Sequence, residues 1–172
     1  METIESIEKQ PSMKEPRPAF LTVLCVLSFV FIGFSLLFGL IGLAGGPMNE
    51  EQLLDYSVQL TKSADEMRSL DMESFAVMME QIGRMTVSVN NHFYLNSIFS
   101  LIIIGSGLFG VIKMMQGHKI GFHLYIIYSL ASIGQIYMFV SPADIPSFIV
   151  IFNLLISGIF ILMYSRNLKW LS

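Results

Sequence analysis

Length, composition and charge already restrict the class of this protein. The chain has 172 residues, of which 53% are hydrophobic and only 13% are charged, whereas an average soluble domain is about 25% charged. These values exclude an ordinary soluble globular protein. The formal net charge of −3 provides no basic field for nucleic acid, and the single cysteine, Cys25, excludes an intrachain disulfide.

Four stretches of the sequence contain no Asp, Glu, Lys or Arg, namely residues 18–49, 85–112, 120–143 and 145–165. The shortest is 21 residues long, and a helix needs about 20 mostly apolar residues to cross a bilayer. We therefore predict an all-α polytopic membrane protein embedded in the lipid bilayer. Its four transmembrane helices are expected at residues 18–46, 93–115, 120–140 and 146–165.

The charged residues of the connections predict the orientation, because Lys and Arg accumulate on the cytoplasmic side of a membrane. Seven of the ten basic residues fall on one side of the predicted spans: Lys9, Lys14, Arg17, Lys113, Lys119, Arg166 and Lys169. Nine of the thirteen acidic residues fall on the other side. We therefore predict that tails 1–17 and 166–172 are cytoplasmic and that segment 47–92 is extracytoplasmic.

Segment 47–92 has the pattern of a helical hairpin. Gly45-Gly46-Pro47 ends the first span, and Asn49 with Gln52 is a predicted capping box that starts a new helix. Apolar residues then recur every three or four positions in two seams, whose phases differ by one residue. We place the break at residues 69–71, with Asp71 as the expected N-cap of the second arm. The acidic character of the segment favours a hairpin that projects from the membrane.

Two features of the hairpin are compatible with other arrangements. Ser63-x-x-Glu66 is a competing capping box, which would divide the first arm into two short helices on the membrane surface. Apart from Gly83 and the glycines of the span, no breaker separates Met72 from Met115. The second arm is therefore also compatible with direct continuation into the 93–115 helix.

Each predicted span carries one face of small or polar residues at helical spacing. In lipid, small residues allow helices to approach closely, and hydroxyls or amides bond between helices, so we expect these faces to point into the bundle. The predicted packing residues are Ser35, Gly39, Gly42, Gly107 and Gly110. The predicted polar contact or path residues are Asn96, Gln135, Asn153 and Ser157.

Gln135 and Asn153 carry amide groups inside predicted spans, where an unpartnered polar group is costly. Both lie towards the short connection at Ser141-Pro-Ala-Asp-Ile-Pro146, so we expect the two side chains to meet. A hydrogen bond between the helices is the simpler interpretation of this pair. Lining a path for a solute is the alternative.

The sequence argues against several kinds of chemistry. No ionisable residue lies at membrane depth in a predicted span, which disfavours ion-coupled transport. Gly105-Ser-Gly107-Leu-Phe-Gly110 has the spacing of a dinucleotide-binding motif, but it lies inside a predicted membrane helix without the strand that such a motif requires. There is no zinc-protease motif and no acid pair at membrane depth, so we predict neither enzymatic activity nor a cofactor.

Methionine is abundant in and around the hairpin, at positions 48, 67, 72, 78, 79 and 85. Thioether groups bind Cu(I), but methionine acts much more often as an adaptable apolar filler. We therefore predict no metal site.

Two segments carry a resemblance to a family. Met114-Met-Gln-Gly-His-Lys119-Ile-Gly121-Phe-His-Leu-Tyr125 and the opening Pro18-Ala-Phe-Leu-Thr22 resemble small uncharacterised four-helix membrane proteins of bacteria. The two segments together comprise 17 of the 172 residues. It implies a bacterial inner-membrane location and brings no known activity.

These observations lead to two hypotheses. The first is a non-catalytic accessory or scaffolding subunit that docks a membrane or periplasmic protein partner through its outer hairpin and small-residue faces. The alternative is a homo-oligomeric channel or passive carrier, in which the polar stripes of the 120–140 and 146–165 helices line the path.

Overall fold

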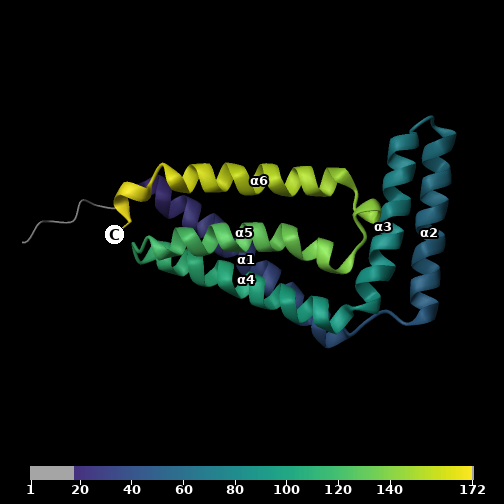
Figure 1. The fold of residues 1–172 in the computed structure, drawn as a ribbon, viewed down its shortest axis with the longest axis horizontal. Coiled ribbons are helices and arrows are strands. Elements are labelled where there is room, and N and C mark those ends of the chain that lie inside the picture. Colours follow the sequence, from purple (N-terminus) through teal and green to yellow (C-terminus); the bar gives the residue numbers. More distant parts are fainter. Residues whose placement is uncertain (1–17, 172) are drawn as a thin grey trace, which may run out of the picture.

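The computed structural model describes residues 18–171 and is all-helical within that range (Figure 1). Its six α-helices are α1 (Ala19–Gly45), α2 (Glu50–Ser69), α3 (Glu73–Asn91), α4 (Phe93–Met115), α5 (Ile120–Phe139) and α6 (Ser147–Ser165). Two short 3-10 turns complete the order, η1 (Pro142–Asp144) and η2 (Leu168–Trp170). Lys9, Lys14 and Arg17, which contribute to the predicted orientation, lie outside the described residues.

Four of the helices, α1, α4, α5 and α6, are long and apolar enough to cross a membrane. They are 27, 23, 20 and 19 residues long, and even α6 therefore extends about 28 Å at 1.5 Å per residue. Their outer sides expose large apolar residues such as Phe31, Phe38 and Leu162, each at least 66% exposed. An apolar surface of this extent is characteristic of contact with lipid. The predicted all-α class and the four apolar helices are confirmed within the described residues, and these helices indicate a membrane-embedded protein.

The two ends of α2 show which of the predicted helix-capping motifs are formed in the structure. The predicted capping box is confirmed, because Gln52 N–H donates to the Asn49 side chain at 2.8 Å and the Gln52 side chain accepts from Asn49 N–H at 3.0 Å. α2 continues unbroken through Ser63 and Glu66, so the competing break is not used. The predicted role of Asp71 as an N-cap is wrong. Asp71 instead has a positive φ of 59° in the reversal, and Met72 precedes the first residue of α3.

The α2–α3 hairpin lies crosswise over one end of the bundle of four long helices (Figure 1). Contacts between α3 and η1 hold it in this crosswise position. The chain turns at His92 between α3 and α4, whose φ of −114° and ψ of 26° are not helical. The two helices are thus separate, and α3 does not continue into α4 as one straight helix.

α4 is the central helix of the bundle and packs against both α1 and α5. Glycines permit the close crossing of α4 and α5: a Cβ on Gly107 would lie 2.6 Å from the Tyr128 ring, and Gly121 lies directly against the backbone of Gly110 and Met114. α6 packs less extensively, along α5. Its end is held by Tyr164, which is completely buried and donates to Ser28 Oγ at 2.9 Å and Leu24 O at 3.1 Å in α1.

Candidate functional site

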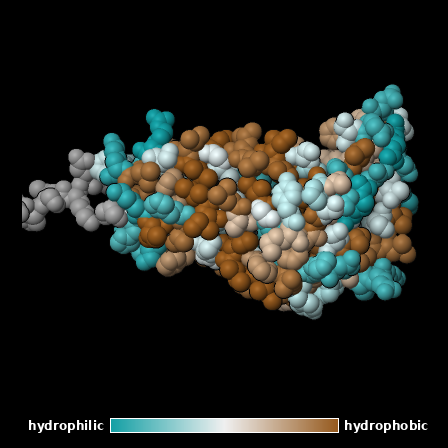
Figure 2. Space-filling view, viewed as in Figure 1, coloured by the Kyte–Doolittle hydropathy of each residue, from teal (hydrophilic) through white to brown (hydrophobic). Residues whose placement is uncertain are grey.

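Charge separates the two ends of the molecule. All nine acidic residues of the described range belong to the hairpin or to η1, whereas Lys113, Lys119, Arg166 and Lys169 lie at the other end. Figure 2 shows hydrophilic side chains gathered at both ends and a hydrophobic band between them. This is the distribution expected when a bilayer surrounds the middle of the bundle, because the hydrocarbon core excludes charge.

The hairpin is fastened to the bundle through η1. Arg84 Nε of α3 donates to Asp144 Oδ1 at 2.6 Å, and Gln81 Nε2 donates to the carbonyl oxygen of Ala143 at 3.0 Å. η1 begins at Pro142, whose missing N–H and restricted φ suit the first position of a helical turn. A second proline, Pro146, is fully buried before α6. The rigid connection between α5 and α6 therefore presents Asp144 to α3.

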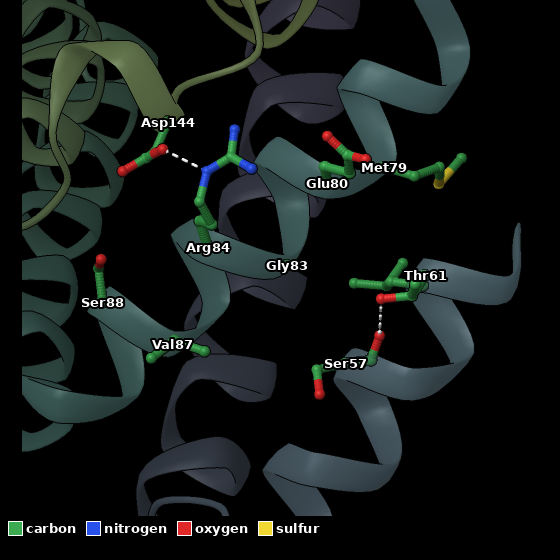
Figure 3. A pocket seen from close by; sticks show the side chains of 10 residues that line it. Ser57, Thr61, Met79, Glu80, Gly83, Arg84, Val87, Ser88 and Asp144 are labelled. Carbon is green, nitrogen blue, oxygen red and sulfur yellow. Dashed lines mark hydrogen bonds and ion pairs between the residues drawn. The ribbon is translucent and has the colours of Figure 1, made fainter. Parts of the chain in front are cut away.

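A groove of about 600 Å³ lies between the two arms of the hairpin and η1, and Figure 3 shows its walls. Ser57 and Thr61 come from α2, Glu80 and Arg84 come from α3, and Asp144 closes one side. The Thr61 hydroxyl donates to the Ser57 carbonyl at 2.9 Å. The Arg84 guanidinium is already paired with Asp144. This groove therefore presents hydroxyls and two carboxylates, those of Glu80 and Asp144, but no arrangement of nucleophile and base.

A second cation joins the arms of the hairpin near their reversal. Arg68 of α2 lies 2.5 Å from Glu80 and 3.5 Å from Glu73 of α3, and 3.3 Å from Asp65 of its own helix. The hydrogen bond and charge of Glu80, followed by the charge of Glu73, raise the pKa of the Arg68 guanidinium above its ordinary value. The ion pairs of Arg68 thus join α2 to α3 within the hairpin, whereas the ion pair of Arg84 connects the hairpin to the bundle.

Gln135 is the best-connected polar residue among the predicted site residues. Its side chain is 9% exposed, and Nε2 lies 2.8 Å from Asn96 Oδ1, 2.9 Å from Asn96 O and 2.6 Å from Ser100 Oγ. The structure therefore brings together Gln135 and Asn96, which were both predicted to lie on polar faces, and joins α5 to α4 through them.

The expected meeting of Gln135 and Asn153 is wrong. Asn153 is exposed on α6, and its Nδ2 donates to Ile149 O of the same helix at 2.8 Å. The reason is the packing order: α5 turns Gln135 towards α4, while α6 packs along a different side of α5. Asn153 and the half-buried Ser157 instead line a cavity between α1, α5 and α6.

The predicted packing residues have different environments. Gly107 and Gly110 are buried against α5, and a Cβ on Gly39 would lie 3.1 Å from Leu101 of α4. Gly42 is exposed with no atom within 4 Å of an added Cβ, and the Ser35 hydroxyl donates to Phe31 O of its own helix. The expectation that the whole small-residue face of the first span points inward is therefore wrong at Gly42. The outer part of α1 reaches beyond the packed core.

Three structural contacts were not predicted from the sequence: Arg84 with Asp144, Tyr164 with Ser28, and the close approach at Gly121. The sequence did contain a signal for the Arg84–Asp144 pair, because Asp144 is the only Asp, Glu, Lys or Arg between residues 120 and 165 and would need a partner. The partner of Tyr164 is 136 residues away, so no local pattern identifies it.

The histidines and acidic residues of the described range form no recognisable metal centre. Within residues 18–171 no group of three or more His, Cys, Asp or Glu side chains is placed to hold a metal ion. His92 Nδ1 and His123 Nδ1 each lie 3.1 Å from a carbonyl oxygen of their own helix. Comparison of the chain with protein-family models, with curated proteins and with solved structures finds no match.

Proposed function

We propose that this protein is a non-catalytic accessory or scaffolding subunit of the bacterial inner membrane, and that it docks a partner on its α2–α3 hairpin. The observation that carries the proposal is the crosswise hairpin, held on the bundle by Arg84, Gln81 and η1. A helical pair fixed in this way is a preorganised surface, so little conformational entropy is lost when a partner binds.

The side of α2 that faces away from the α3 seam has a composition suited to docking. Leu54 and Val58 are 63% and 43% exposed and are four residues apart, so they share one face of the helix. Glu51, Asp55 and Asp65 are exposed on the same face by helical spacing, and these three carboxylates outnumber Lys62, which lies among them. The complementary partner surface is therefore apolar at its centre and basic at its edge.

Affinity purification of the full-length tagged protein in mild detergent, followed by mass spectrometry, tests this function. A foreign protein should co-purify in stoichiometric amount with the unchanged protein. The Leu54→Ser/Val58→Ser variant should lose it. Val87→Ser is the matched control, because Val87 is a 39% exposed hairpin valine on α3. Recovery of the protein alone as a monomer, or equal capture by both variants, would contradict the proposal.

The proposed orientation has cytoplasmic termini and an extracytoplasmic hairpin. The charge distribution supports it, since the basic end follows the positive-inside rule. In a Cys25→Ala background, Gln59→Cys should react with a membrane-impermeant maleimide in intact bacterial cells, and Lys169→Cys should react only after permeabilisation. Both positions are exposed. The reverse labelling pattern would overturn the orientation.

A homo-oligomeric channel or passive carrier is the second candidate function. The cavity lined by Asn153, Ser157 and hydroxyl-bearing residues of α5 favours it, whereas Gln135 is engaged by α4 and lines no path with Asn153. Recovery of a closed ring of identical chains from the same purification would support this second function over the first.

A further inference from the structure

A cavity of about 460 Å³ lies between α1, α5 and α6, within the part of the bundle that is long and apolar enough to span a membrane. Figure 1 shows α6 running alongside α5. Phe31 and Phe152 line the cavity and are 67% and 54% exposed, so it reaches the outer surface of the bundle. Its volume falls within the range of about 300–1,000 Å³ that is usual for small-molecule sites.

Two serine hydroxyls in the cavity wall have no hydrogen-bond partner among the described residues. Ser129 of α5 is 3% exposed and Ser157 of α6 is half-buried. Serines in membrane helices commonly donate to a carbonyl one turn earlier, and Ser132 and Ser165 of these same two helices do so at 2.8 Å. Ser129 and Ser157 make no such bond. No fully buried side-chain N or O atom of the described residues lacks a partner, so the Ser129 hydroxyl is open to the cavity that it lines and is available to an external acceptor.

The other residues that line the cavity indicate which kind of ligand would supply the hydrogen-bond acceptor. No Asp, Glu, Lys, Arg or His lines the cavity, so a charged ligand would have no counter-ion. Five aromatic rings contribute to it: Phe31, Tyr125, Tyr128, Phe152 and Phe160. Aromatic walls favour a flat ring through stacked or edge-to-face contacts. The fitting ligand is therefore neutral, planar and apolar, with oxygen acceptors on its edge.

The depth of the serines excludes the commonest acceptor in a bilayer. Ser129 is the tenth of the 20 residues of α5, and Ser157 is the eleventh of the 19 residues of α6. Both therefore lie near the middle of their spans, about 15 Å from either edge of the hydrocarbon core. The ester carbonyls of phospholipids stay at those edges, whereas a lipid-soluble ring carrying its own carbonyls reaches the middle.

We propose that the α1/α5/α6 cavity binds a neutral lipid-soluble quinone, whose ring lies among the aromatic side chains and whose carbonyl oxygens accept hydrogen bonds from Ser129 and Ser157. The proposal concerns binding alone and is independent of the docking role of the hairpin. Entry is lateral, between Phe31 of α1 and Phe152 of α6.

Equilibrium binding of duroquinone to the purified full-length protein in detergent micelles tests the proposal. Duroquinone has no unsubstituted ring carbon, so addition to a thiol does not complicate the measurement. Durene is the matched probe because it has the same methylated ring without the two carbonyls. Duroquinone should bind saturably at about one molecule per chain and at least five-fold more tightly than durene. Equal affinity for the two probes, or no saturable binding of duroquinone, would overturn the proposal.

Variants identify the residues responsible. Ser129→Ala/Ser157→Ala should weaken duroquinone binding about tenfold, in line with the loss of two hydrogen bonds, and should leave durene binding unchanged. Ser165→Ala is the matched control, because that α6 hydroxyl already donates to Leu162 O. Unchanged duroquinone affinity in the folded double variant would assign the binding elsewhere. If the double variant fails to fold, the relative affinities of duroquinone and durene for the unchanged protein still test the proposal.

Discussion

Arg84 Nε of α3 lies 2.6 Å from Asp144 Oδ1 of η1, and this ion pair joins the hairpin to the connection between α5 and α6. The two residues are 60 positions apart in the chain. Their side chains are 51% and 23% exposed, so solvent and salt reach the pair. Its role is therefore to hold the position of the hairpin, with a modest contribution to stability.

A double-mutant cycle on Arg84→Ala and Asp144→Ala should give a coupling free energy of about 0.2–1 kcal/mol at low salt, as is usual for partly exposed pairs. The coupling should shrink in about 1 M salt, where the Debye length is about 3 Å. Thermal unfolding in a non-ionic detergent measures it. Arg68→Ala is the control, since the acidic partners of Arg68 belong to the hairpin itself. Additive effects of the two substitutions at low salt would refute the link.

Gln135→Leu should destabilise the bundle by about 0.6–2 kcal/mol, because it removes a donor shared by Asn96 and Ser100 across α4 and α5. Asn153→Leu should change stability by less than about 0.5 kcal/mol, since that amide is exposed and bonds to its own helix. Unfolding by sodium dodecyl sulfate, followed by circular dichroism, compares them. An equal loss in both variants would show that the Asn96 contact is not what stabilises this part of the bundle.

Gly121→Ala should lower stability by about 1–3 kcal/mol or prevent assembly, because the new Cβ would lie 2.5 Å from Met114 N and directly against Gly110 O. Gly105→Ala provides the comparison within α4, where an added Cβ has no atom within 4 Å. That variant should be neutral or more stable by up to about 1 kcal/mol, through helix propensity. The same unfolding assay ranks the two variants, and the opposite ranking would contradict the crossing of α4 and α5.

Tyr164→Phe should cost about 0.5–1.5 kcal/mol, because it removes the hydroxyl that donates to Ser28 and Leu24 in a completely buried position. Tyr137→Phe makes the same chemical change on a residue that is 46% exposed, and it should have no measurable effect. Hydrogen exchange along α6 provides a second measurement, with faster exchange expected near residue 164 only in the first variant. Unchanged exchange there would mean that the bond does not anchor α6.

Several features of the fold follow from the sequence without knowledge of the packing. The four apolar helices are determined by uninterrupted stretches without charge, because the hydrocarbon core excludes charged groups over a fixed thickness. The start of α2 is likewise local, since the Asn49–Gln52 capping box involves residues only three positions apart. The pattern of two offset seams correctly indicates a pair of helices between the first and second apolar helices.

The tertiary structure decided which polar residues meet and how the hairpin lies. Gln135 was recognisable as a residue in need of a partner, but only the packing order of α4, α5 and α6 selects Asn96 over Asn153. The acidic composition could not reveal that Arg84 and Asp144 would hold the hairpin crosswise. The physical reason is range: burial in lipid and helix capping act on each segment separately, whereas these contacts depend on how segments rotate and cross against one another.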